Sequence, residues 1–157
     1  MAIVHQVLSA PDLDEVYAYA SGRLAKSEPN EQDRMFKSWS AKWRKEALEH
    51  YLKLGWSFIA RDEQTKTALS GGTVVGYFLA QPFLFFRGQT QTLWVEHIEA
   101  DDSAIQQDLV DIAVKVAREK HLQRVLFAEA SALSKELEAW RPELLESDIA
   151  VVKTTKG

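Results

Sequence analysis

Three side chains that can bind or transfer protons lie within four positions in the second half of the chain: Glu96, His97 and Glu99. Carboxylates and imidazoles act as general bases and as metal ligands. Because side chains alternate between the two faces of a strand, Glu96 is expected on one face and His97 with Glu99 on the other. Asp101 and Asp102 follow, but this division of the ligands between two faces predicts no metal site.

The composition narrows the class of protein. Of the 157 residues, 46% are apolar or aromatic and 27% are charged, with no Cys and a net charge of −4. These values exclude a disordered chain and a disulfide scaffold, and they predict no nucleic-acid partner, which would need clustered Lys and Arg. No apolar run approaches the roughly 18 residues of a membrane span, and no export signal is visible at the start. We therefore expect one cytoplasmic domain over residues 1–157 that binds no membrane.

Hydrophobic periodicity organises the first third of the chain. It predicts one strand and two amphipathic helices, at Ile3–Leu8, Leu13–Lys26 and Glu31–Leu54. Gly55 follows the second helix, where a left-handed cap is common. Trp39 and Trp43 lie one turn apart on the apolar stripe of that helix. They are either core residues or the wall of a substrate-binding site.

The rest of the chain predicts an antiparallel meander and then alternating helices and strands. The expected strands are Trp56–Asp62, Thr73–Phe86, Gln91–Glu99, Arg124–Glu129 and Ile149–Lys153, and the expected helices are Ser103–His121 and Ser134–Leu145, the latter interrupted at Pro142. The strand–helix–strand unit from Gln91 to Glu129 is a crossover, so its two strands are expected to be parallel. The pattern predicts an α/β domain with a mixed sheet.

This order of elements resembles the GNAT superfamily of acyl-CoA-dependent N-acetyltransferases over nearly the whole chain. Four local phrases resemble the family's second, third and fourth strands and its central helix, namely Gly55–Ala60, Val74–Pro82, Leu93–Ala100 and Ala117–Leu122. The resemblance implies a mixed, mostly antiparallel central sheet flanked by helices on both faces. It also implies an acetyl group moved from acetyl-CoA to an amine acceptor, with Glu96 or Glu99 as the base.

The resemblance further implies where acetyl-CoA binds. The family holds pantetheine along its fourth strand, which corresponds here to the backbone of Ile98 and Ala100, in a gap before the next strand. The pyrophosphate lies on the amides that open the following helix, where a helix start suits an anion. In this chain those amides belong to Ala104, Ile105, Gln106 and Gln107.

The chain departs from the family at that helix start. The family's spaced glycines should fall within Asp101–Asp108, which contains no Gly. Asp101 and Asp102 place carboxylates there instead, and a like-charge pair about 4 Å apart costs roughly 4 kcal/mol at an effective dielectric of about 20. Asp102 or Ser103 can also act as an ordinary helix cap. An inactive GNAT-fold module that no longer binds acyl-CoA is therefore the alternative to an enzyme.

Each interpretation predicts its own partners. An enzyme takes a small-molecule or peptide amine, with Trp39 and Trp43 as substrate-binding residues. The family often uses a Tyr in the last helix as the acid toward the leaving thiolate, but no Tyr follows Tyr77, which leaves that role vacant or passes it to Ser131 or Ser134. An inactive module binds a protein partner through the same Trp residues and Phe83–Phe86. Exposure of Phe83–Phe86 would also suit a homodimer.

Overall fold

A computed structural model describes residues 1–86, 89–146 and 148–155 of the chain. The chain forms two compact units, Met1–Tyr77 and Phe78–Gly157. The boundary falls within one long strand, β3 (Thr73–Phe86), whose bounds agree with the strand predicted there. The single domain over residues 1–157 stays a prediction.

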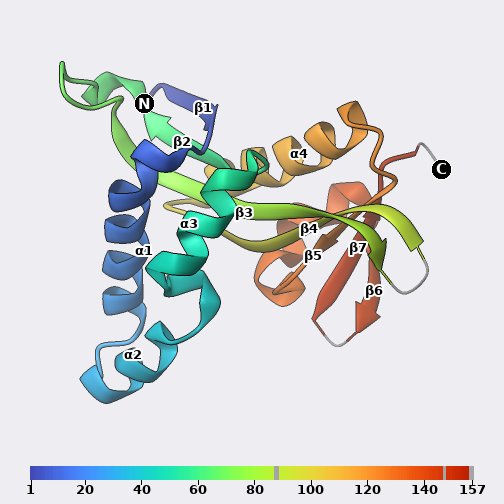
Figure 1. Cartoon of the computed structure of the whole chain (residues 1–157), viewed down its shortest axis with the longest axis horizontal. Coiled ribbons are helices and arrows are strands. Elements are labelled where there is room, and N and C mark those ends of the chain that lie inside the picture. Colours follow the sequence, from blue (N-terminus) through green and yellow to red (C-terminus); the bar gives the residue numbers. More distant parts are fainter. Residues whose placement is uncertain (87–88, 147, 156–157) are drawn as a thin grey trace. The chain divides into compact units, whose positions relative to one another are not determined.

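The first unit joins two paired strands to a set of helices (Figure 1). Strands β1 (Ile3–Val7) and β2 (Phe58–Asp62) are antiparallel. Helix α1 (Leu13–Ser27) packs against α3 (Lys45–Leu54). Their contact follows from the apolar spacing of the sequence, because the residues that both helices bury recur at three or four positions: Val16, Ala20 and Leu24 in α1, and Leu48, Tyr51 and Leu52 in α3.

The single helix predicted over Glu31–Leu54 is wrong. The segment contains α2 (Glu31–Ser38), a short 3-10 turn (Ala41–Trp43) and α3. Two features interrupt it: the Ser38 hydroxyl donates to the Met35 carbonyl at 2.6 Å, and Arg44 is extended with ψ 132°. Serine side chains that bond to nearby backbone compete with helix formation. Gly55 does adopt the left-handed conformation predicted for the cap, with φ 75°.

A buried cation links three segments of the first unit. The Arg61 side chain, on β2, is 3% exposed and lies 2.7 Å from Glu15 and 3.0 Å from Asp12. It also donates to the Gly72 carbonyl at 2.8 Å. Gly72 has φ +114°, and a Cβ atom there would collide with the Asp62 carbonyl, so the turn before β3 requires glycine. Arg61 therefore ties β2 to the start of α1 and to this turn.

The second unit contains the parallel pair of the sheet. Strand β4 (Gln89–Ala100) is followed by α4 (Ser103–Glu119) and β5 (Arg124–Phe127), and β4 pairs with β5 in parallel, which confirms the crossover. Helix α4 packs on both strands, and every residue that it buries is apolar. Strand β7 (Ile149–Lys153) then pairs antiparallel with β5.

The predicted last helix is also shorter than expected. Helix α5 covers only Ser134–Leu137, and a 3-10 turn, Glu138–Trp140, follows it. Arg141 then takes a left-handed conformation with φ 51°. It precedes Pro142, and a residue before proline is disfavoured in a right-handed helix, so the helix does not continue. After Pro142 the chain forms β6 (Glu143–Glu146), a strand that the periodicity did not predict. It pairs with β7 through a register shift after Leu144.

The described strands form one sheet in the order β1-β2-β3-β4-β5-β7-β6. This mostly antiparallel sheet with flanking helices confirms the predicted fold class. Within the described ranges, no helix is long and apolar enough to cross a bilayer. The side chains of Leu84, Phe85 and Phe86 lie outside the described part, so the partner surface predicted at Phe83–Phe86 stays a prediction. The Phe83 ring lies 6.2 Å from that of Trp94.

Candidate functional site

The ladder between β4 and β5 ends before β4 does. Its register runs from Thr92–Arg124 to Val95–Phe127, and the Ala128 amide then donates to the Val95 carbonyl at 3.0 Å. Strand β4 continues from Glu96 to Ala100 beyond the last of these pairs. In the described ladder, the backbone of Glu96–Ala100 is therefore not paired with β5. This is the place where the sequence analysis expects pantetheine.

The uncovered segment of β4 brings together three titratable side chains. The His97 imidazole lies between two carboxylates, with Nδ1 2.9 Å from Glu129 Oε2 and Nε2 3.2 Å from Glu99 Oε2. The His97 side chain is 8% exposed, against 16% for Glu99 and 35% for Glu129. Burial alone would lower the pKa of His97, but the hydrogen bonds to Glu129 and Glu99 outweigh it and raise the pKa above its usual value. The arrangement favours an imidazolium ion.

The other face of β4 carries the second predicted base. The Glu96 carboxylate is half-buried and accepts a hydrogen bond from Trp94 Nε1 at 2.7 Å. The structure therefore brings Glu99 together with His97, and Glu96 together with Trp94, which is the division that strand alternation predicts. Ile98, 8% exposed, and Ala100 are buried.

At the start of α4, two of the four backbone amides predicted to hold pyrophosphate, those of Ile105 and Gln106, have Asp102 as their partner. The Asp102 carboxylate accepts from the Ile105 amide at 2.9 Å, and the Asp102 carbonyl accepts from the Gln106 amide at 3.1 Å. Asp102 is therefore a helix N-cap. An anion at this helix start would lie beside its negative charge.

A second carboxylate approaches the same helix start from α5. Glu136 is buried, and its carboxylate accepts from the Ser103 hydroxyl at 2.9 Å. The Gln107 side chain donates to the Glu136 carbonyl at 3.0 Å, and the Gln106 side chain donates to the Ala132 carbonyl at 3.3 Å. These contacts fix α5 and the 3-10 turn Ala130–Leu133 against the first turn of α4. The side chains of Gln106 and Gln107, whose backbone amides were predicted to bind the cofactor, thus serve the internal packing of this unit.

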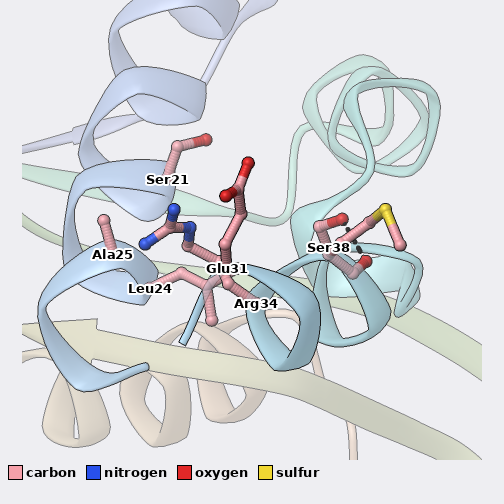
Figure 2. Close-up of a pocket in the computed structure, with 7 residues that line it drawn as sticks. Ser21, Leu24, Ala25, Glu31, Arg34 and Ser38 are labelled. Carbon is pink, nitrogen blue, oxygen red and sulfur yellow. Dashed lines mark hydrogen bonds between the residues drawn. The ribbon is translucent and has the colours of Figure 1, made fainter. Parts of the chain in front are cut away.

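A groove of about 530 Å³ lies in the first unit between α1 and α2 (Figure 2). It is lined by Ser21, Leu24, Ala25, Glu31, Arg34, Met35 and Ser38. Neither Trp39 nor Trp43 belongs to this lining. Trp39 is 62% exposed and packs edge-to-face on Phe36 at 5.1 Å, so a core position for Trp39 is wrong. Trp43 is half-buried beneath Lys42, whose Nζ lies 4.4 Å from the ring centroid.

The two serines considered for the acid role line an apolar pocket of about 250 Å³ in the second unit. Its lining is Ala130, Ser131, Ser134, Leu137, Pro142, Leu144 and Ala150. Within residues 1–86, 89–146 and 148–155, no group of three His, Asp or Glu side chains is arranged to hold a metal ion. At His97 the reason is visible, because its two ring nitrogens face different carboxylates.

Sequence reasoning missed two residues of the site, Glu129 and Glu136. Glu136 carried a usable signal, since it falls beside Leu133 and Leu137 at helical spacing, and a carboxylate on an apolar face requires a partner. Glu129 was predicted only as the end of a strand. Its contact with His97 depends on the register between two strands, which periodicity does not determine.

Comparisons with known proteins address the fold. No protein-family model and no curated protein matches the sequence. Solved structures do match. The PaiA N-acetyltransferase of Thermoplasma acidophilum, solved in complex with coenzyme A, matches with TM-score 0.68 and 14% identity, covering 99% of this chain and 100% of that one. A probable acetyltransferase of Staphylococcus epidermidis matches with TM-score 0.70 and 14% identity, covering 98% of this chain and 100% of that one.

A GNAT-family acetyltransferase of Brucella melitensis, solved with acetyl-CoA, matches with TM-score 0.68 and 10% identity, covering 99% of this chain and 90% of that one. The structural similarity spans nearly the whole of each chain, but the sequence identities are only 10–14%. The similarity is therefore one of fold. The resemblance proposed from the order of elements is thereby confirmed at the level of structure: the chain has the GNAT fold of N-acetyltransferases.

Proposed function

We propose that the protein is an acyl-CoA-dependent N-acetyltransferase that moves an acetyl group to an amine. The observation that carries this proposal is the extension of β4 from Glu96 to Ala100 beyond its ladder with β5, in a chain with the fold of proteins solved with coenzyme A or acetyl-CoA. Main-chain groups left uncovered beside a strand end suit the amides of a pantetheine arm, which can pair with them as a further strand would.

Strand alternation indicates which residues supply those main-chain groups. The Val95 carbonyl points toward β5, since it accepts from Ala128. Peptide groups alternate along a strand, so His97 and Glu99 direct their N–H and C=O groups to the same side, and Ile98 and Ala100 to the other. We therefore propose His97 and Glu99, in place of Ile98 and Ala100, as the backbone partners of pantetheine.

Glu96 is the stronger candidate for the base. Acetyl-CoA supplies an activated acetyl thioester, and the acceptor ammonium has to lose a proton before its nitrogen can attack. The Glu99 carboxylate is already engaged by the His97 ring, whose Nε2 lies 3.2 Å from Glu99 Oε2. Glu96 accepts only the neutral indole N–H of Trp94 among its described contacts, and its carboxylate can take the ammonium proton. The Glu96 carboxylate favours a cationic acceptor, a small-molecule or peptide amine.

A second candidate function rests on a different observation. Asp102 caps α4, and the buried Glu136 carboxylate binds Ser103 at the same helix start. Both carboxylates oppose a diphosphate at that helix start. This observation favours a binding module that keeps the GNAT fold without binding acyl-CoA.

Binding of acetyl-CoA separates the two candidates. Calorimetric titration and thermal unfolding suit the test, because a ligand at about 100 times its dissociation constant stabilises a protein by about 2.7 kcal/mol. Asp102→Ser is the informative variant, since serine still caps a helix but removes the charge. Glu119→Gln, at the exposed end of α4, removes one charge elsewhere and is the control.

We expect the wild type to bind acetyl-CoA and Asp102→Ser to bind it more tightly than Glu119→Gln does. Absence of binding to all three proteins at millimolar acetyl-CoA would reject the acetyltransferase in favour of the binding module. If binding is found, acetyl transfer to a panel of primary amines should be lost in Glu96→Gln and retained in Glu99→Gln. The opposite result would transfer the role of base to Glu99.

A further inference from the structure

The contact between His97 and Glu129 continues the β4–β5 register after the main-chain ladder has ended. The last pair of the ladder is Val95 with Phe127. His97 lies two positions beyond Val95, and Glu129 lies two positions beyond Phe127, so the side chains of these residues meet where the next same-face pair would stand. The 2.9 Å contact between Nδ1 and Oε2 thus joins β4 to the turn after β5.

The backbone holds Glu129 in place for this contact. Glu129 has φ 59° and ψ 40°, a left-handed conformation that is unfavourable for residues other than glycine, asparagine and aspartate. The next residue, Ala130, donates its amide to the Asp148 carbonyl at 2.9 Å, which anchors the turn to the segment before β7. A residue held in an unfavourable conformation by its surroundings indicates a constraint on its side chain.

Charge determines how strong the contact is. The charged groups that face His97 are Glu129, from the turn after β5, and Glu99, from its own strand, while α4, packed on β4, buries only apolar residues. An imidazolium donates one N–H to each carboxylate, whereas a neutral imidazole can donate to only one. The hydrogen bonds to Glu129 and Glu99 raise the pKa of His97 and so favour the charged form.

We propose that His97 and Glu129 form a latch that holds β4 against the turn after β5 and must open before a ligand can lie along Glu96–Ala100. The ligand meant is the pantetheine arm of acetyl-CoA, so this inference rests on the proposed function. A ligand that pairs with the β5 side of His97 and Glu99 occupies the space between the strand ends that the latch spans. The latch is strong while His97 is charged and weakens when it loses its proton.

Glu129→Asn tests the latch without disturbing the turn. Asparagine adopts the left-handed conformation more readily than glutamate, and its shorter side chain does not reach His97. Glu119→Gln again is the control, because both variants lose one negative charge and coenzyme A is an anion. The two variants are compared at the same pH, which cancels the titration of the coenzyme phosphates.

Two measurements are made on each protein. The first is amide hydrogen exchange of Ala128 without ligand, because this amide donates to the Val95 carbonyl in the last main-chain hydrogen bond beside the latch. We expect this exchange to become at least tenfold faster in Glu129→Asn at pH 6 than in Glu119→Gln. The second is the affinity for acetyl-CoA, which we expect to be about tenfold higher in Glu129→Asn at pH 6, with a smaller ratio at pH 8.5.

The outcomes are distinguishable. Unchanged hydrogen exchange in Glu129→Asn would overturn the latch, whatever the affinity for acetyl-CoA. Faster exchange with equal or weaker acetyl-CoA binding would overturn its role in ligand entry. If exchange becomes faster but no protein binds acetyl-CoA, the latch between the strand ends is supported, while its role in entry and the proposed function are both overturned.

Discussion

Each of the two units buries a cation between two carboxylates, and the two cations differ in chemistry. In the first unit, Arg61 contacts Glu15 and Asp12 and also donates to a backbone carbonyl. In the second unit, His97 contacts Glu99 and Glu129. A guanidinium keeps its charge at every physiological pH, whereas an imidazole can lose its charge near neutrality. The first arrangement is permanent and the second depends on conditions.

The Arg61 cluster and the His97 cluster also differ in where they lie in the fold. Arg61 joins a strand, a helix start and a turn that all belong to the frame of the first unit, and the glycine in that turn has no substitute. His97 lies where a ladder of main-chain hydrogen bonds has ended and side chains alone connect the two segments. We infer that a buried ion pair within a frame maintains structure, while one at an uncovered strand end is suited to opening.

The largest effect is expected from Arg61→Met. Removing one partner of a buried ion pair costs about 3–5 kcal/mol, because the remaining polar groups lose their partner. We expect that loss in the free energy of unfolding, measured with urea, and the same loss at pH 6 and pH 9. Arg44→Met is the control, since the Arg44 side chain is exposed and its contact with the exposed Glu46 is long, at 3.8 Å. A loss below about 1 kcal/mol for Arg61→Met would contradict a structural role for this cluster.

A smaller, pH-dependent effect is expected from His97→Gln. The pKa of folded His97 is raised above its ordinary value of 6.5, so the stability that its charge contributes is complete below pH 6.5 and is lost as pH rises through the folded pKa. We expect a loss of about 1–3 kcal/mol at pH 5.5, decreasing toward pH 9. Urea unfolding at several pH values measures it, with the exposed His121→Asn as control. If the stability loss in His97→Gln did not vary with pH, the His97 cluster would be as independent of pH as the Arg61 cluster, which would contradict the comparison.

The cap of α4 should contribute less than either ion cluster. Asp102→Ala is expected to lower the free energy of unfolding by about 1 kcal/mol, because the Ile105 amide loses its acceptor. Asp102→Ser should recover most of that loss. Equal stability of the two variants in thermal unfolding would mean that the charge of Asp102, and not its hydrogen bond, accounts for its effect.

The smallest effect is expected at Trp39. Its side chain is largely exposed, so Trp39→Ser should change the free energy of unfolding by no more than about 0.5 kcal/mol. Leu48→Ala, at a fully buried position of the same unit, should cost about 2–5 kcal/mol. Chemical unfolding of both variants tests this contrast. A large loss for Trp39→Ser would restore the core position that its spacing had predicted.

The fold was predictable from the sequence where one local pattern runs without interruption. The bounds of β3 and the start of α4 agree with prediction because a continuous apolar run after a glycine turn and an Asp-Asp-Ser cap are local signals. The single helix over Glu31–Leu54 was wrong, because helical spacing continued across residues whose backbone leaves the helix. The helix predicted over Ser134–Leu145 with an interruption at Pro142 ends earlier, at Leu137. Ser38, whose hydroxyl bonds to the Met35 carbonyl, and Pro142, which disfavours a helix at the residue before it, lie near the ends of these helices. Both signals oppose a helix, but the apolar spacing around them is the stronger pattern in the sequence.

The candidate site divides in the same way. The pairing of His97 with Glu99 was predictable, since residues two apart on a strand share a face. The contacts of His97 with Glu129 and of Ser103 with Glu136 join residues more than thirty positions apart. They depend on strand register and helix packing, which arise from the whole fold and leave no periodic trace in a single sequence.

The short last strand of the sheet has a consequence for how the protein behaves in concentrated solution. Strand β6 stands at the sheet margin, spans only Glu143–Glu146, and breaks register beside the exposed Leu144. A brief, irregular and charged margin is a poor template for strands of other molecules. The largely buried and apolar β7, which β6 covers, would be a good template. Strand β6 therefore keeps β7 from pairing with strands of other molecules and so disfavours polymerisation.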